Sequence, residues 1–162
     1  MKKCVFAGTF DPPTTGHTQV IENCLKIFDE TVVAVMVNHD KAPLFSVEER
    51  LYLLGKLYGS NPAVRIISFE GTAADLLERE NTPFYVRGIR NTVDFEYENR
   101  NNFSTKKLKP DLIPIYFPAG QESLHISSTL VKNLYKFKKD FSQYVPEQIS
   151  ADVLKILNAK EK

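Results

Sequence analysis

The chain has 162 residues, of which 43% are hydrophobic and 25% are charged, and its formal net charge is +1. This length and composition are typical of one soluble globular domain, so we expect residues 1–162 to form a single domain. The balanced charge argues against a nucleic-acid-binding protein that relies on bulk positive charge, because each phosphate contact needs its own cation. A site for one small polyanion stays possible.

The chain has two cysteines, Cys4 and Cys24, and no Cys or His spacing typical of a metal site. We expect both to be buried free thiols, as in a reducing compartment. The apolar run 4–7 is shorter than the roughly 7 to 15 residues of a signal peptide, and no segment approaches the roughly 18 apolar residues of a membrane span. We therefore expect a cytoplasmic protein without membrane contact.

Short apolar runs alternate with helical patterns along the chain, which is typical of βαβ units on a parallel sheet. The runs predict strands at 5–7, 32–37, 64–69, 84–86 and 112–117. The second run has no polar interruption, which favours a central strand covered on both faces. Pro114 cannot donate to a neighbouring strand, so the fifth strand should lie at an edge of the sheet.

Helical patterns occupy the intervals between these strands. Apolar spacing predicts a first helix that begins near His17, and Ser46 with Glu49 forms a capping box that opens a second one. Further helices are predicted at 72–80, 92–107 and 127–138. The last helix is expected to begin with Pro146 as its first residue.

The turn from Gly8 to His17 joins the first strand to the first helix. In a doubly wound sheet, ligands bind beside strand one, at the carboxyl ends of the strands. Gly8 and Gly16 allow close backbone approach, the free amides of the helix favour an anion, and His17 adds a donor. An ordinary loop capped by His17 is the alternative that spacing alone leaves open.

Three basic side chains follow strands at the same edge of the predicted sheet. Lys41 lies in the loop after the second strand, and Arg87 and Arg90 follow the fourth, where two guanidinium groups can converge on phosphates. The alternatives are a solvent-exposed lysine and surface ion pairs between the arginines and Asp94 or Glu96.

The segment 127–129 opens a helix and offers hydroxyls and unpaired amides to a triphosphate. An ordinary N-cap cluster needs no ligand and is the alternative. Glu98, on the preceding predicted helix, is by itself interpreted as a solvated carboxylate. The sequence shows no Walker motif, no Ser/His/Asp arrangement and no paired carboxylates.

The segment 8–17 resembles the T/HxGH motif of the nucleotidyltransferase superfamily, with Thr14 where most members have His. Its GTFDPPTTGH form is similar to that of the bacterial phosphopantetheine adenylyltransferases. Three more blocks match that family in order, at Lys41 to Arg50, Arg87 to Glu98 and Ile126 to Lys132. The resemblance implies an α/β, Rossmann-like fold with a doubly wound five-stranded parallel sheet, order 3-2-1-4-5, and helices on both faces.

The resemblance also implies a reaction, the transfer of AMP from ATP to 4′-phosphopantetheine, which gives dephospho-CoA and pyrophosphate in coenzyme A biosynthesis. The acceptor phosphate is already ionised, so in-line displacement needs neither a general base nor a covalent intermediate. Mg²⁺ is implied as a cofactor held mainly by the ATP phosphates, with no protein metal site. Further implications are a homohexamer and dephospho-CoA or CoA as product or feedback ligand.

The same resemblance assigns roles to individual residues. The implied catalytic residues are His17, Lys41 and Arg90, with His17 stabilising the pentacovalent centre and the departing pyrophosphate. The implied acceptor-binding residues are Thr9, Lys41, Ala73 and Arg87. The implied ATP-binding residues are Thr9, Phe10, His17, Gly88, Ile89, Arg90, Glu98, Ser123, Leu124, His125, Ile126, Ser127, Ser128 and Thr129.

The chain departs from the family pattern in three places, one of which is Ala73, where a larger apolar residue is common. Asn101, Ser104 and Thr105 stand where the family lines the pantetheine groove with apolar residues and an Asn, and lost apolar contact weakens binding by about 25 cal/mol per Å². Leu124 and His125 replace residues near the adenine. Two alternatives therefore stay open: a sister enzyme acting on nicotinamide mononucleotide or glycerol phosphate, and a nucleotide or CoA sensor without turnover.

Overall fold

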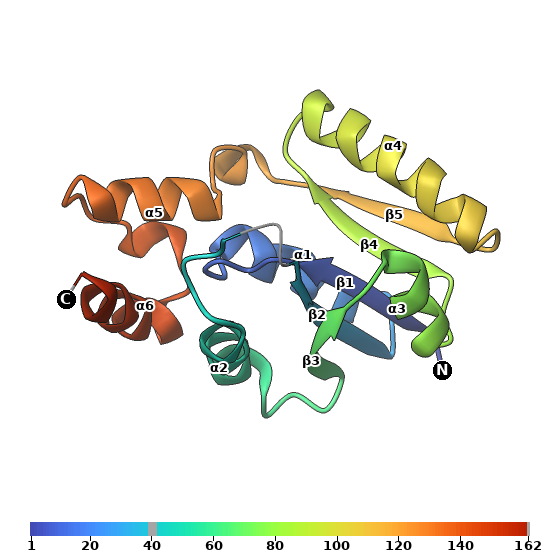
Figure 1. The fold of residues 1–162 in the computed structure, drawn as a ribbon, viewed down its shortest axis with the longest axis horizontal. Helices are drawn as coiled ribbons and strands as arrows, with labels where there is room; N and C mark the ends of the chain where they lie inside the picture. The colour runs from blue at the N-terminus through green and yellow to red at the C-terminus, as the bar shows by residue number, and fades with distance from the viewer. Residues whose placement is uncertain (39–41, 162) are drawn as a thin grey trace.

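The computed structural model describes residues 1–38 and 42–161, which form a parallel sheet surrounded by helices (Figure 1). The strands are β1 Lys3–Gly8, β2 Glu30–Val37, β3 Val64–Glu70, β4 Phe84–Ile89 and β5 Ile113–Pro118. All pairings are parallel, and the order is β3-β2-β1-β4-β5. Both the predicted order and the edge position of the strand that contains Pro114 are confirmed.

The helices are α1 Thr15–Leu25, α2 Val47–Tyr58, α3 Ala73–Arg79, α4 Thr92–Leu108, α5 Ser128–Lys136 and α6 Glu147–Lys160, with short 3₁₀ turns η1 Gln121–Ser123 and η2 Ser142–Tyr144. The predicted capping box of Ser46 and Glu49 is present. The first helix begins two residues before His17, because Thr14 is its N-cap. Pro146 is an N-cap and not a first helical residue, since its ψ of 137° is extended.

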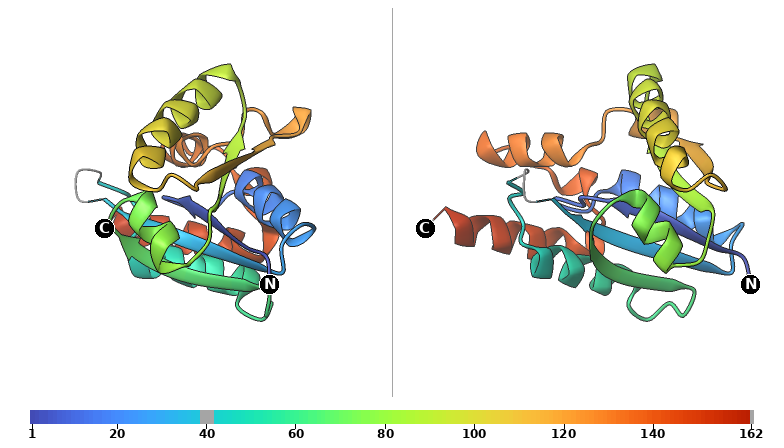
Figure 2. Two further views of the ribbon diagram at one scale, coloured as in Figure 1. Left: turned by 90° about the vertical axis from the view of Figure 1, so that its right-hand side faces the viewer. Right: turned by 45° about the vertical axis from the view of Figure 1, so that its right-hand side comes forward.

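The sheet is covered on both faces, as Figure 2 shows for α1 and α4 on opposite sides. One apolar cluster packs α1 and α2 on the sheet, and the other packs α3 on its opposite face. The residues Val32 to Val35 of β2 are completely buried, alternating between these two clusters. The predicted central position of this uninterrupted apolar strand is confirmed. Cys4 and Cys24 are buried free thiols, as expected.

A third apolar cluster joins the end of the chain to α2. Val153 and Leu157 of α6 pack with Phe45 just before α2, with Leu53 in the middle of α2 and with Val131 of α5. Lys132 of α5 and Pro43 of the loop before α2 line the cavity described next, so this cluster supports part of its wall. Among the described helices, none is both long and apolar enough to cross a membrane.

Candidate active site

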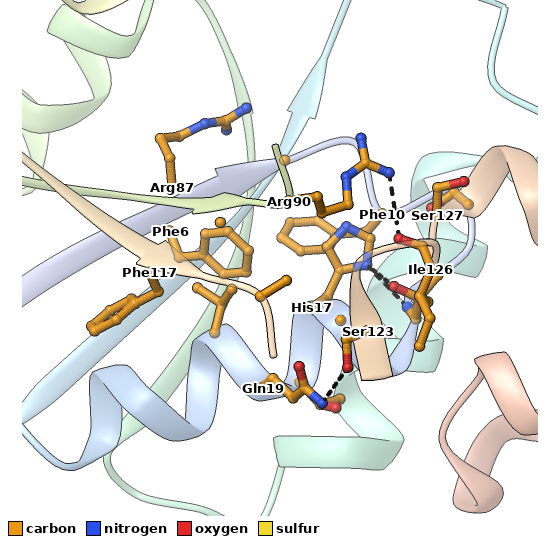
Figure 3. A pocket seen from close by; sticks show the side chains of 18 of the residues that line it. Phe6, Phe10, His17, Gln19, Arg87, Arg90, Phe117, Ser123, Ile126 and Ser127 are labelled. Atoms are coloured by element: carbon orange, nitrogen blue, oxygen red, sulfur yellow. Dashed lines mark hydrogen bonds between the residues drawn. The ribbon is translucent and has the colours of Figure 1, made fainter. Parts of the chain in front are cut away.

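A cavity of about 1060 Å³ opens at the carboxyl ends of β1 and β4, beside the N-termini of α1 and α5. This is the place where doubly wound sheets bind ligands. Most of the sequence-predicted site residues line it: Thr9, Phe10, His17, Arg87, Gly88, Ile89, Arg90, Glu98, Ser123, Ile126, Ser127, Ser128 and Thr129. Figure 3 shows His17 at its centre, with Arg90 and Ser127 nearby.

The loop after β1 is held against α1 by aromatic packing. Phe10 is buried with a positive φ of 53°, and its ring lies edge-on to His17 with 4.9 Å between centroids. A Cβ at Gly8 would approach this ring to 3.1 Å. The absence of a side chain at Gly8 therefore leaves space for the Phe10 ring. The positive φ of Phe10 is a strained conformation for a non-glycine residue, and proteins retain such strain mainly at functional sites.

The imidazole of His17 is oriented by the backbone at the start of α1. Its Nδ1 accepts the Thr14 N–H at 3.0 Å. A neutral imidazole has one protonated nitrogen, so this bond places the proton on Nε2. His17 can therefore donate one hydrogen bond from Nε2 to a ligand in the cavity.

The charge state of His17 follows from its surroundings. Burial, together with the neighbouring cations Arg87 and Arg90, lowers the pKa of His17 to about 4. Burial disfavours the charged imidazolium, and positive neighbours disfavour it further. At neutral pH His17 is therefore an uncharged hydrogen-bond donor, and the positive charge of the cavity comes from arginine and lysine.

Arg87 is fixed by groups on two elements. Its guanidinium donates to the Ala7 carbonyl at the end of β1 and to the Glu98 carboxylate on α4. Its Nε–H is buried and has no hydrogen-bond partner. Arg87 itself pairs with Glu98 rather than with Asp94 or Glu96, the partners in the alternative interpretation.

Arg90 forms the surface ion pair that was the alternative interpretation. Its guanidinium donates to Asp94 at 2.9 and 3.3 Å, and its second terminal nitrogen reaches the Ile126 carbonyl at 3.4 Å. Such a fork holds the guanidinium in a fixed orientation. The ion pair and a role toward phosphates are compatible, because Arg90 lines the cavity while it is bound to Asp94.

The N-terminus of α5 contributes amides to the same cavity. Ser127 is the N-cap and accepts the Leu130 N–H at 3.0 Å, as the ordinary capping interpretation required. Ser128 donates its hydroxyl to the Pro12 carbonyl at 2.7 Å, which ties α5 to the loop after β1. The remaining free amides and the positive end of this helix favour a negatively charged group.

Two residues that assemble the cavity are not among those predicted from the sequence. Asp11 is buried, and its carboxylate accepts the N–H groups of Leu44 and Phe45 and the ammonium of Lys132, at 3.1, 2.7 and 2.7 Å. Arg50 donates to the Thr9 carbonyl at 2.9 Å. Both residues lie in the matched blocks, but their partners are distant in sequence, so no local pattern pointed to these contacts.

Four predicted residues are not placed in this cavity. Lys41 lies outside the described residues. Ala73, at the start of α3, packs against the apolar cluster on that face of the sheet. Leu124 is exposed, and the ring of exposed His125 lies edge-on to Tyr144 with 5.5 Å between centroids. The described lining includes none of these three.

Comparison with known proteins decides the family. The profile of the cytidylyltransferase-like family matches residues 5–134, four fifths of the chain. The chain belongs to the cytidylyltransferase-like family. Phosphopantetheine adenylyltransferases of Clostridium kluyveri and Lachnoclostridium phytofermentans are each 36% identical to it, over 96% and 99% of this chain and 94% and 98% of theirs. That of Clostridium tetani is 35% identical over 99% of this chain and all of its own. The resemblance drawn from the motifs is confirmed.

A solved structure supports the fold. A crystal structure of a candidate nicotinate-nucleotide adenylyltransferase from Vibrio parahaemolyticus superposes with a TM-score of 0.67, covering 95% of this chain and 99% of that one. The sequence identity is 23%, so the likeness concerns the fold alone. The Rossmann-like sheet is thus shared with a protein of low sequence similarity.

Proposed function

We propose that this chain transfers AMP from Mg-ATP to 4′-phosphopantetheine, giving dephospho-CoA and pyrophosphate in coenzyme A biosynthesis. The observation that carries the proposal is His17, a neutral donor held by Thr14 in a cavity that also contains Arg87 and Arg90. Relatives that are 36% identical over nearly the full length of this chain carry the name of this activity. In such a site the phosphates supply the reacting groups and the protein supplies position and charge.

The proposed reaction is an in-line displacement at the α-phosphorus of ATP. An oxygen of the acceptor phosphate forms the new bond, the bond to the β-phosphate oxygen breaks, and its electron pair leaves with pyrophosphate. His17 donates from Nε2 to the oxygens that gain charge in the transition state, and Arg90 faces the departing phosphates. Preorganised donors of this kind need no reorganisation as the charge develops.

The acceptor side of the proposed site lies around Arg87. Thr9 and Arg87 line the cavity from the ends of β1 and β4, where they can bind the acceptor phosphate beside the α-phosphate. Lys41 is proposed as the third cation of this group, and Ala73 as a contact of the pantetheine arm. The free amides of α5 and Ser127 to Thr129 are proposed to bind the triphosphate.

The donor set of the described residues does not fit a resident metal. No group of three His, Cys, Asp or Glu side chains among them could hold an ion. Asp11 and Asp94, the aspartates in the cavity, are each paired with a cation. We therefore treat Mg²⁺ as part of the Mg-ATP substrate, and no step above depends on a protein-bound metal.

We also propose three features that the family resemblance implies. They are a homohexamer, a cytoplasmic location, and dephospho-CoA or CoA as a feedback ligand. Exposed apolar side chains on α4, among them Val93, Tyr97 and Phe103, support an association of copies. Large side chains of this kind are costly to leave in water. A particle mass near six chains in light scattering is expected, and a monomer at all concentrations would contradict the hexamer.

The test is pyrophosphate release from Mg-ATP with three acceptors in parallel: 4′-phosphopantetheine, nicotinamide mononucleotide and glycerol phosphate. The nucleotide product is identified by mass. We expect dephospho-CoA from phosphopantetheine alone. Product from another acceptor would reassign the substrate to a sister enzyme, and ATP binding without any product would identify a sensor.

A further inference from the structure

One polar contact inside the cavity has no part in the chemistry described above. Gln19, on α1 two residues after His17, donates from Nε2 to the hydroxyl of Ser123 at 2.7 Å. Both residues line the cavity (Figure 3). Ser123 is 3% exposed and belongs to the η1 turn after β5, whereas the Gln19 side chain is exposed. The pair thus places a free amide edge in the ligand space.

This pair lies away from the groups that suit phosphates. In Figure 3, Arg90 and Gln19 are on opposite sides of His17. Past Gln19 the cavity continues between α1 and the end of β5, where residues 117–120 line it. No heavy atom lies within 4 Å of a Cβ built at Gly120, so the backbone there is open to a flat group. A nucleotide whose α-phosphate is at His17 therefore extends its base toward Gln19.

The amide of Gln19 matches the hydrogen-bonding edge of adenine. Adenine offers an amino donor beside a ring-nitrogen acceptor, and an amide offers a carbonyl acceptor beside an N–H donor. One N–H of Gln19 is used by Ser123, which leaves Oε1 and the second N–H for the base. With Nε2 next to Ser123, the free edge of the amide presents Oε1 and the second N–H in one order, and guanine presents its donor and acceptor in the reverse order.

We propose that Gln19, held by Ser123, reads the base of the nucleotide and selects adenine over guanine. The proposal rests on the proposed function only in taking the ligand to be a nucleoside triphosphate with its α-phosphate at His17. Glutamine forms the same pairing with adenine in nucleic-acid recognition, where a good two-bond contact discriminates against the wrong base by roughly tenfold or more. Gln19 is thus a specificity-determining residue of the nucleotide site.

The test measures the dissociation constants of Mg-ATP and Mg-GTP by calorimetry for the full chain and three variants. Gln19→Glu replaces the amide by a carboxylate, which only accepts hydrogen bonds. It repels the ring nitrogen of adenine and suits the adjacent N–H and amino donors of guanine. Ser123→Ala frees the amide to rotate. Gln148→Glu, at an exposed position on α6, adds the same charge outside the cavity.

The native chain is expected to bind Mg-ATP at least about tenfold more tightly than Mg-GTP. Gln19→Glu should shift this ratio toward GTP by about tenfold or more, Ser123→Ala should reduce it, and Gln148→Glu should leave it unchanged. The inference would be overturned if the ratio of ATP to GTP affinity in Gln19→Glu stayed within about twofold of the native ratio. It would also be overturned if the native chain bound the two nucleotides with equal affinity, or bound neither. Selective ATP binding without dephospho-CoA formation would overturn the proposed function and leave the inference standing.

Discussion

His17 is the residue on which the proposed chemistry depends most directly. It supplies one preorganised hydrogen bond from Nε2, and loss of such a donor typically reduces turnover by about 10² to 10³. We expect His17→Ala to lower kcat at least about a hundredfold while Mg-ATP still binds, because Arg90 and the α5 amides remain. Steady-state kinetics and calorimetry measure the two quantities, and near-normal turnover would remove His17 from the mechanism.

The low pKa of His17 also predicts a pH dependence of stability. The unfolded imidazole takes up a proton near its ordinary pKa of 6.5, whereas the folded one does so only near pH 4. Between these values the unfolded state binds more protons, so the free energy of unfolding falls as the pH is lowered from about 6.5 toward about 4. The contribution is fully present above that window.

Urea denaturation at several pH values across this window measures the free energy of unfolding of the native chain and of His17→Asn. Groups that titrate in both proteins affect both curves, so the difference reports His17. The native curve should fall more steeply on acidification. Parallel curves would show that His17 titrates normally in the folded protein.

Glu98 gives a prediction that separates two roles. The family resemblance implies a contact with ATP, but the structure pairs its carboxylate with Arg87 on the acceptor side. Glu98→Gln should therefore raise KM for phosphopantetheine by about tenfold, since a charge-assisted bond that orients Arg87 is lost, and leave KM for ATP within about twofold. Glu96→Gln, on the same helix and exposed, is the matched control. A selective rise in KM for ATP would contradict this prediction and favour a direct contact between Glu98 and ATP.

At the scale of elements, the sequence predicts the sheet well because burial on both faces leaves a direct signature. The apolar run of β2 and Pro114 in β5 identify the central and edge strands without any tertiary information. Helix starts are predicted less exactly. Thr14 and Pro146 both act as N-caps, and whether a residue caps a helix or belongs to it is decided by its ψ angle, which composition does not specify.

The packing of α1 on β4 predicts a difference between two glycines of the cavity. A Cβ at Gly88 would meet Val20 Cγ2 at 2.9 Å, whereas a Cβ at Gly120 would meet nothing within 4 Å. Gly88→Ala should lower the free energy of unfolding by about 1 to 3 kcal/mol, as overpacked cores do. Gly120→Ala should change it by less than about 0.5 kcal/mol. Urea denaturation of the two variants tests this, and equal stabilities would contradict the close contact between α1 and β4.

At the scale of the whole molecule, the cavity depends on contacts that no local pattern contains. The carboxylate of Asp11 binds an ammonium 121 residues later in the chain, and Ser128 donates to a carbonyl 116 residues earlier. The motifs identified lining residues at the carboxyl ends of β1 and β4 and at the start of α5, because the sequence marks these positions locally. The residues that hold the loops together, Asp11 and Arg50, become recognisable only when the chain is folded.

The last helix provides a test of how far the cavity wall depends on the end of the chain. The family match stops at residue 134, yet α6 completes the apolar cluster that supports α2. Leu157 is 1% exposed and belongs to this cluster, whereas Leu154 on the same helix is 44% exposed. Leu157→Ala should cost about 2 to 5 kcal/mol and Leu154→Ala less than about 0.5 kcal/mol.

Because α2 also carries Arg50, which holds the Thr9 carbonyl, loss of this support should reach the cavity. Leu157→Ala is therefore expected to raise KM for the acceptor at temperatures where the protein is still folded, and Leu154→Ala is not. Urea denaturation and steady-state kinetics at one temperature measure both effects. A destabilised Leu157→Ala with native KM would mean that the β1–α1 loop keeps its position without α6, through Asp11 and Ser128 alone.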